Sequence, residues 1–218
     1  MSLWIKICGN TSAGDAQLAA GAGANAVGFV FAPGPRQVTA ALVASIAPAL
    51  PDTVEKIGVF VDASFDEIES TVCASGLTGV QLHFDAAANL PGRLRKRFGP
   101  ALRILRVIHF GAGAARSAVH ADADPDVDAV LVDSYSAKAA GGTGVAFEWA
   151  AAKTLFQNPE ARKRIAAGGL TPVNVAEAIA ALRPWGVDVV SGLEISPGRK
   201  DPDKVRDFIR NARAAESA

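Results

Sequence analysis

Residue types that build metal sites and disulfide frameworks are scarce in this sequence. It contains two cysteines, Cys8 and Cys73, and three histidines among 218 residues. The cysteines lie far apart in different contexts, which argues against a disulfide framework and favours a reducing, cytoplasmic location. The histidines are scattered, and no C-x-x-C pair, Walker loop or G-x-S-x-G elbow is present. The sequence therefore predicts acid–base chemistry without a metal ion or a cofactor.

The sequence also has no net charge and no long hydrophobic run. The 22 lysines and arginines balance the 22 aspartates and glutamates, and no basic run stands out, so we expect no nucleic-acid partner. A glycine, proline or charged residue interrupts each apolar stretch before it reaches membrane-spanning length, and the first residues do not resemble a secretory signal. We therefore expect no membrane partner. No exposed apolar stripe is evident, so a monomer is the default expectation.

Half of the residues are hydrophobic, and many of them form short runs that alternate with longer, alanine-rich segments. Three segments predict helices most clearly. Residues 11–23 have a cap at Thr11 or Ser12, residues 62–76 have apolar side chains at helical spacing, and residues 171–186 have Pro172 in the first turn. The predicted strands are residues 3–7, 26–31, 56–61, 79–83, 102–108, 128–132, 164–167 and 187–191.

Strict alternation of strands and helices predicts a (β/α)8 TIM barrel with a parallel eight-stranded core. The nearly continuous hydrophobicity of the strands is typical of a parallel sheet covered by helices. An open, doubly wound sheet is the alternative, but it would more often have fewer strands and a G-x-G-x-x-G turn after the first strand. The segment here is "CGNTSAG". No linker or repeat is evident, so residues 1–218 are expected to form a single domain.

Catalytic residues of such barrels lie on the loops that follow the strands. Cys8 follows the first strand, where a thiol could act as a nucleophile or a general base, or could be a small buried hydrophobic residue. Asp133 ends the sixth strand, where a carboxylate either caps a turn or acts as an acid–base group. Position alone leaves both alternatives open for each residue.

Other polar side chains at the strand ends could bind a ligand. Arg36 follows a stiff Pro/Gly loop after the second strand, and its guanidinium could bind a carboxylate or phosphate or form a surface salt bridge. We interpret His83, after the fourth strand, as pocket lining. Asp188 in the last strand is either a buried partner or a contact to ligand hydroxyls, with the structural role favoured. Glu194 and the basic residues 198–200 are interpreted as loop and helix-terminus electrostatics.

Three glycine-rich segments follow the sixth, seventh and eighth strands. Any one of them could be a simple turn, but in these barrels the last strands commonly hold a phosphate through backbone N–H groups. Together they favour a phosphorylated ligand. The candidate phosphate-binding residues are Gly142, Thr143, Gly144, Gly168, Gly169, Ser191 and Gly192.

The strand ends, taken in order, resemble those of the phosphoribosylanthranilate isomerase family of tryptophan biosynthesis. The resemblance covers nearly the whole chain, with the order and spacing of the family intact. "KICG" and the series from "GGTG" to "AGGL" are together quite specific. The matching segments are "KICGNT", "GFVFAPGPRQV", "GVFVD", "VQLH", "LVDS" followed by "GGTG" and "FEW", "AAGGLTPVNV", and "GVDVVSGLE" leading to "PGRKD".

The resemblance implies an Amadori rearrangement of N-(5-phosphoribosyl)anthranilate to 1-(2-carboxyphenylamino)-1-deoxyribulose 5-phosphate. It implies that Cys8 is the general base, that Asp133 is the general acid, and that Arg36 lines the substrate site. It also implies that the glycine-rich segments hold the phosphate. The family often has two serines before the last glycine, whereas this chain has Val190 and Ser191, which bears on phosphate affinity and not on the reaction.

Two alternative functions are weighed against this one. The histidine-pathway isomerase performs the same chemistry on a related barrel, but that family has an aspartate where this chain has Cys8, and no second phosphate site is evident. A dual-substrate isomerase is a variant of this alternative. A non-catalytic phosphate-ligand-binding barrel would be expected to lack the acid–base pair, whereas Cys8 and Asp133 are both present.

Overall fold

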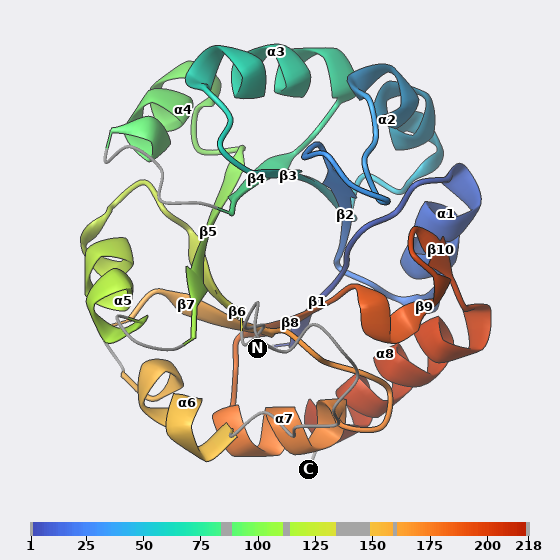
Figure 1. The fold of residues 1–218 in the computed structure, drawn as a ribbon, viewed down its shortest axis with the longest axis vertical. Helices are drawn as coiled ribbons and strands as arrows, with labels where there is room; N and C mark the ends of the chain where they lie inside the picture. The colour runs from blue at the N-terminus through green and yellow to red at the C-terminus, as the bar shows by residue number, and fades with distance from the viewer. Residues whose placement is uncertain (1, 84–88, 111–113, 134–148, 159–160, 217–218) are drawn as a thin grey trace.

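The computed structural model describes residues 2–83, 89–110, 114–133, 149–158 and 161–216. Eight parallel strands form a closed barrel in chain order, and Figure 1 shows the helices as a ring around it. The predicted (β/α)8 barrel is therefore confirmed, and the open sheet is excluded. The strands are β1 (Trp4–Ile7), β2 (Ala26–Val30), β3 (Glu55–Phe60), β4 (Gly79–Leu82), β5 (Arg103–His109), β6 (Ala129–Asp133), β7 (Lys163–Ala167) and β8 (Gly186–Val189).

Three helices on the outside of the barrel begin at a residue whose side chain caps their first N–H groups. Ser12 and Thr39 each accept a hydrogen bond from the first turn of the helix they cap, and Ser64 forms a capping box with Glu67. The helices are α1 (Ala13–Ala22), α2 (Ala40–Ile46), α3 (Phe65–Ser75), α4 (Leu90–Phe98), α5 (Ala114–Ala123), α6 (Trp149–Phe156), α7 (Val175–Leu182) and α8 (Pro202–Glu216).

One predicted helix start is wrong. Pro172 does not lie in the first turn of α7, because the helix begins at Val175 with Asn174 as its N-cap. The preceding residues form a turn in which the N–H of Thr171 donates to Oδ1 of Asn174. The local side-chain bond competes with the helix for this backbone, as is common for asparagine. Pro172 is therefore part of the loop that follows β7.

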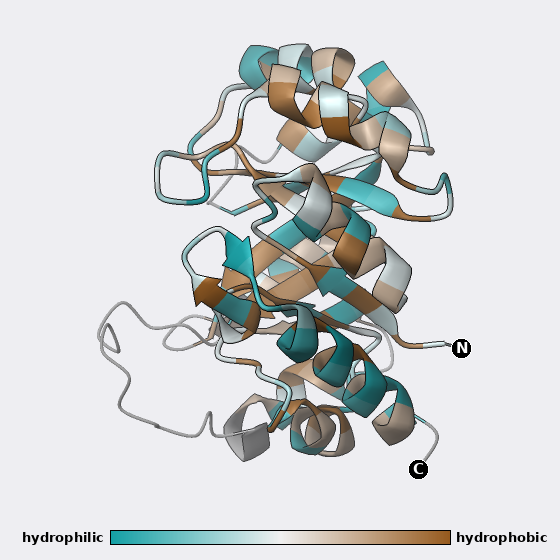
Figure 2. Cartoon of the chain, turned by 90° about the vertical axis from the view of Figure 1, so that its right-hand side faces the viewer, coloured by the Kyte–Doolittle hydropathy of each residue, from teal (hydrophilic) through white to brown (hydrophobic). Residues whose placement is uncertain are grey.

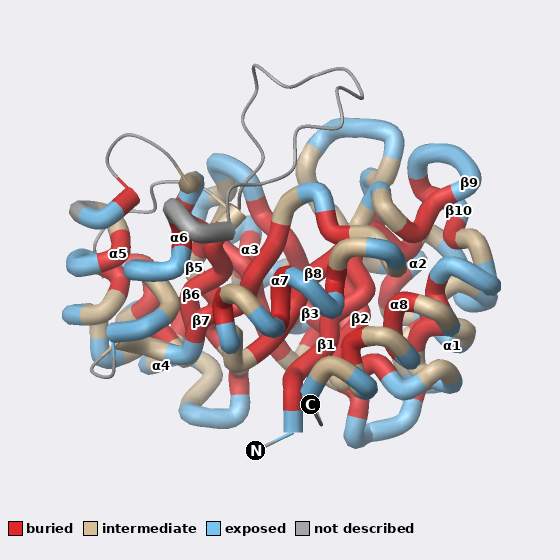
Figure 3. Tube along the Cα trace, turned by 90° about the horizontal axis from the view of Figure 1, so that it is seen from below, coloured by how far each residue is buried: buried red, intermediate tan, exposed pale blue. Residues whose placement is uncertain are grey.

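The barrel has an inner and an outer apolar layer. The inner layer includes Trp4, Ile57, Leu105 and Leu131, whose side chains alternate with residues that pack against the helices. In Figure 3 the strands form the buried centre, and exposed segments lie on the outside. The two faces of each strand are both covered, which explains the nearly continuous hydrophobicity of the strand sequences.

A short antiparallel ribbon after β8 was not predicted from the sequence. It consists of β9 (Glu194–Ser196) and β10 (Arg199–Lys200), and it precedes α8. In Figure 2, α8 presents a largely hydrophilic surface to the viewer, while its buried residues include Phe208 and Ile209. Among the described helices, none is both long enough and apolar enough to cross a membrane.

Candidate active site

A cavity of about 460 Å³ opens where the strands end, at the mouth of the barrel. The structure brings together there every predicted site residue that it describes. A larger hollow of about 670 Å³ lies elsewhere, next to α4, and contains none of them. Gly142, Thr143 and Gly144 lie outside the described residues. The predicted site residues that line the cavity are Cys8, Arg36, His83, Asp133, Gly168, Gly169, Asp188, Ser191 and Gly192.

Cys8 is buried and held at the end of β1. Its backbone N–H donates to the carbonyl of Val189 at 2.9 Å. Its thiol lies against Gly28 of β2, where an added Cβ would be 2.5 Å from Sγ, so that only glycine leaves room for the thiol. Burial raises the pKa of the Cys8 thiol, and the positive charges of Lys6 and Lys200 oppose this effect. The pKa of the enclosed thiol therefore stays above its usual value, because burial and the charge of Asp188 outweigh the two neighbouring cations.

Lys6 is a site residue that the sequence interpretation missed. Its ammonium is fully buried inside the barrel and donates to Oδ1 of Asp188 and to Oε1 of Gln81, both at 2.9 Å. Burial alone would lower the pKa of Lys6, but the charges of Asp188 and Cys8 outweigh it and raise the pKa. The alternation in "WIKIC" could have indicated it, because residues 4, 6 and 8 share one face of a strand.

Arg36 pairs with Glu194 in the ribbon that follows β8. The two side chains form a bidentate pair, with Nε–Oε1 at 2.8 Å and Nη2–Oε2 at 2.5 Å. The Glu194 side chain is only 4% exposed. Burial tends to raise the pKa of Glu194, but the hydrogen bond from Arg36 and the charge of Lys200 lower it below its usual value. The pair is therefore not a simple surface salt bridge, because its carboxylate is buried at the edge of the cavity.

Lys200 connects this pair to Cys8. Its buried ammonium donates to the carbonyl of Cys8 at 2.6 Å, to the carbonyl of Val190 at 3.2 Å and to Oε1 of Glu194 at 3.3 Å. Burial lowers the pKa of Lys200. The interpretation of Glu194 and Lys200 as loop and helix-terminus electrostatics was wrong, because both side chains are buried and Lys200 holds the backbone at Cys8. Arg199 is exposed, so nothing contradicts the interpretation for this residue. The sequence interpretation missed the roles of Glu194 and Lys200 because it did not predict the ribbon of β9 and β10, which buries both side chains next to Cys8.

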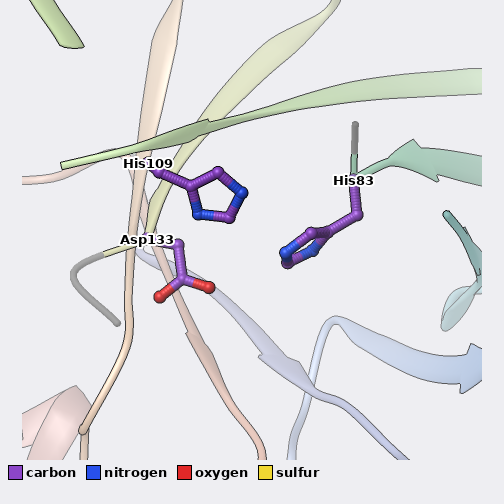
Figure 4. A group of neighbouring side chains, drawn as sticks. All are labelled: His83, His109 and Asp133. Carbon is purple, nitrogen blue, oxygen red and sulfur yellow. The ribbon is translucent and has the colours of Figure 1, made fainter. Parts of the chain in front are cut away.

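His83, His109 and Asp133 come from three neighbouring strand ends, β4, β5 and β6, and point toward a common space (Figure 4). One ligand atom from each lies within 4.8 Å of the others. Burial lowers the pKa of His83, which favours its neutral form. The interpretation that the histidines are scattered is therefore wrong for His83 and His109. These two residues are far apart in the sequence, but in the fold they flank Asp133, the predicted general acid.

The glycine-rich ends of β7 and β8 are packed against each other. An added Cβ on Gly192 would lie 1.9 Å from the carbonyl oxygen of Leu170, so no other residue fits there. Gly168 and Gly169 have φ values of +86° and +66°, which favour glycine. The two segments therefore meet at one side of the cavity.

Fold and site together define a (β/α)8-barrel protein whose mouth holds a thiol, a carboxylate and glycine-rich strand ends around one cavity. The sequence model of the family described as N-(5'phosphoribosyl)anthranilate (PRA) isomerase matches residues 5–211. The chain therefore belongs to the phosphoribosylanthranilate isomerase family.

Relatives in sequence and structure support this assignment. The chain is 43% identical over 211 residues to the N-(5'-phosphoribosyl)anthranilate isomerase of Citrifermentans bemidjiense, with 96% of each chain covered. It is 43% identical over 210 residues to that of Pseudomonas fluorescens, covering 95% of this chain and 97% of the relative. The crystal structure of the Thermotoga maritima enzyme superposes with a TM-score of 0.87 at 32% identity, covering 97% of this chain and 99% of that chain.

A further crystal structure of a phosphoribosylanthranilate isomerase is similar to this chain. It holds reduced 1-(o-carboxyphenylamino)-1-deoxyribulose 5-phosphate and has a TM-score of 0.84 at 30% identity, with 97% of this chain and 99% of that chain covered.

Proposed function

We propose that this chain is a phosphoribosylanthranilate isomerase of tryptophan biosynthesis. The observation that carries the proposal is the family match over residues 5–211, combined with a cavity that Cys8 and Asp133 both line. A similar barrel binds a reduced form of the reaction product. The substrate would be N-(5'-phosphoribosyl)anthranilate, and the product 1-(2-carboxyphenylamino)-1-deoxyribulose 5-phosphate.

In the first step, protonated Asp133 donates its proton to the ring oxygen of the ribose. The bond between this oxygen and C1 breaks as the anthranilate nitrogen forms a double bond to C1, which gives a Schiff base. Asp133 is left as a carboxylate. General acid catalysis of this kind typically contributes about 10²–10⁴-fold in rate.

In the second step, the Cys8 thiolate removes the proton from C2, which the neighbouring iminium makes acidic. The electron pair of the C2–H bond forms the C1=C2 double bond of an enol-amine. Protonation at C1 and loss of the C2 hydroxyl proton then give the ketone. Lys6 and Lys200 support this step because their positive charges oppose the rise in the pKa of the Cys8 thiol that burial causes.

The remaining predicted residues would hold the substrate. The glycine-rich ends of β7 and β8, with residues 142–144, would bind the phosphate, and this remote binding energy can be used at the reacting carbon atoms. Arg36, fixed by Glu194, would orient the anthranilate carboxylate. His83 lines the pocket, and Asp188 would contact substrate hydroxyls in addition to holding Lys6.

A fluorescence assay for the consumption of phosphoribosylanthranilate tests the proposal. The wild-type chain should turn over this substrate and not the histidine-pathway aminoaldose. Turnover of only the second substrate would support the histidine-pathway alternative, and turnover of both a dual-substrate enzyme. Binding of the reduced product without any turnover would support the non-catalytic barrel.

Other properties of the chain are proposals as well. Both cysteines are free, which supports a reducing compartment such as the cytoplasm. We propose a monomer formed by a single domain. A similar structure is of monomers of the dimeric phosphoribosylanthranilate isomerase from Thermotoga maritima. Sedimentation or light scattering of this chain decides between the two states.

A further inference from the structure

Three side chains that can bind a metal ion converge at the barrel mouth. β5 pairs with both β4 and β6, and His109 lies directly opposite Asp133 in the ladder. His83, the residue after β4, completes the group. The two imidazole rings have centroids 5.1 Å apart and planes inclined at 57°, so they do not stack face to face. Figure 4 shows both rings and the Asp133 carboxylate turned toward the same space.

The donor set suits a particular class of cation. Two imidazoles and one carboxylate are typical ligands of zinc and of related divalent transition metals, and hard cations such as Mg²⁺ prefer oxygen ligands alone. Metal–ligand bonds of about 2.0–2.2 Å place two ligand atoms of one ion at most ~4.4 Å apart. The atoms of this cluster lie within 4.8 Å of one another. Side-chain movements of less than about an ångström are therefore enough to bring all three ligand atoms within bonding distance of one ion.

The cluster is accessible from the barrel mouth. His109 is exposed, and His83 and Asp133 are half-buried. Among the described residues, no side-chain hydrogen bond holds either imidazole. Three protein ligands would leave a further coordination position for water, as in zinc sites that are open to a cavity.

We propose that His83, His109 and Asp133 bind one zinc-class divalent metal ion, and that this ion inhibits the isomerase. The inhibitory part rests on the proposed function. An Asp133 oxygen that is bonded to the ion cannot deliver a proton to the ribose ring oxygen, and the ion with its water occupies the space in front of it. Metal and substrate then exclude each other at the mouth.

A Co²⁺ titration of chelator-treated protein tests the site without any use of catalysis. All variants carry Cys73→Ser to remove the exposed thiol. The parent protein should bind one equivalent of Co²⁺ per chain and show visible d–d absorption. This absorption should disappear when Zn²⁺ replaces the Co²⁺. His109→Gln should weaken binding at least ~10-fold, comparable to the loss on perturbing a metal site. His120→Gln is the matched control, because this exposed histidine lies on α5, and it should bind like the parent.

Three results would overturn the site. They are the absence of one-equivalent binding, equal affinity of His109→Gln and the parent, and a thiolate-to-Co²⁺ charge-transfer band that Cys8→Ser abolishes. The last result would identify Cys8 as the ligand in place of the cluster.

Activity assays with Zn²⁺ test the inhibitory part separately. Zn²⁺ should inhibit the parent in competition with substrate, and a chelator should restore turnover. Inhibition of each protein is expressed relative to its own rate without metal. The Zn²⁺ concentration that gives half-inhibition should then be at least ~10-fold higher for His109→Gln than for the parent. One-equivalent binding without inhibition would overturn the inhibitory part. A parent protein with no metal-free turnover would instead contradict the proposed function, and the Co²⁺ titration would still decide the metal site.

Discussion

The two sides of the barrel mouth are built differently. Around Cys8, at β1 and β8, two fully buried ammonium groups each contact a carboxylate, Lys6 with Asp188 and Lys200 with Glu194. At the ends of β4 to β6, His83, His109 and Asp133 are half-buried or exposed. One side is therefore a closed network of paired charges, and the other is an open group of titratable side chains.

The difference shows how a barrel can combine a rigid and an adjustable half in one site. A charge inside the protein is costly unless it is paired and hydrogen-bonded, so the network around Cys8 tolerates few substitutions. An exposed group keeps its hydration and can be exchanged at low cost. We expect the rigid half to dominate stability, and both halves to be needed for the reaction.

The largest expected effect is on catalysis, where the two halves should be equivalent. Cys8→Ala and Asp133→Ala should each lower turnover by at least ~10²–10⁴-fold, because each removes one positioned proton-transfer group. Binding of the reduced product should change little, since the glycine-rich strand ends are untouched. Steady-state fluorescence and calorimetry measure the two quantities. Cys73→Ala on α3 is the control and should turn over like the wild type. Near wild-type turnover in either variant would refute the role assigned to that residue.

The next effect should separate the halves by stability. Lys6→Met leaves Asp188 buried without its partner and should lower the free energy of unfolding by about 3–5 kcal/mol. His109→Gln on the open side should change it by less than about 0.5 kcal/mol. Urea unfolding of both variants measures the difference. A loss below about 1 kcal/mol in Lys6→Met would show that the pair is hydrated. Lys6→Met combined with Asp188→Leu should be more stable than Lys6→Met alone.

A smaller effect on stability is expected from Gly28, which packs against the Cys8 thiol. Gly28→Ala places a Cβ 2.5 Å from Sγ and should cost about 1–3 kcal/mol of stability through overpacking. It should also lower turnover, because the thiol has to move. Gly21→Ala is the matched control, since an added Cβ there meets nothing within 4 Å, and in α1 it should stabilise by about 0.4–1 kcal/mol. Equal thermal unfolding of the two variants would argue against the close contact at Cys8.

The smallest expected effect is a pH difference between the halves. The folded pKa of His83 is lowered from 6.5, so its contribution to stability is present above pH 6.5 and is lost as the pH falls below it. The folded pKa of Glu194 is lowered from 4.5, so its contribution is lost only below pH 4.5. As the pH falls from 8 to 4, the urea midpoint should therefore decline first because His83 is protonated, and only later because Glu194 is protonated. His83→Gln should flatten the curve just below pH 6.5, and an unchanged slope there would contradict this order.

Much of the fold was predictable because its signals are local. All eight predicted strands exist, and none of their ends differs by more than two residues from that of the structure. The sequence offered Thr11 or Ser12 as the cap of the first helix, and Ser12 takes this position, because capping depends on neighbouring residues. Pro172 was misplaced because a short-range bond between Thr171 and Asn174 competes with the helix.

The site was predictable only in part, for a physical reason that its residues illustrate. Cys8, Arg36 and Asp133 stand at strand ends, and a parallel barrel brings all such ends to one mouth. The partners were not predictable. Lys6 reaches Asp188, and Glu194 reaches Arg36, across most of the chain.

The sequence by itself determined the alternation of strands and helices, the polar residues at the strand ends and the family to which the chain belongs. These depend on hydrophobic periodicity, capping and residue identity, which act over a few positions. Only the tertiary structure decided that Lys6 lies beside Cys8 and that His109 lies beside Asp133. Such contacts depend on strand register and on closure of the barrel, which no local pattern contains.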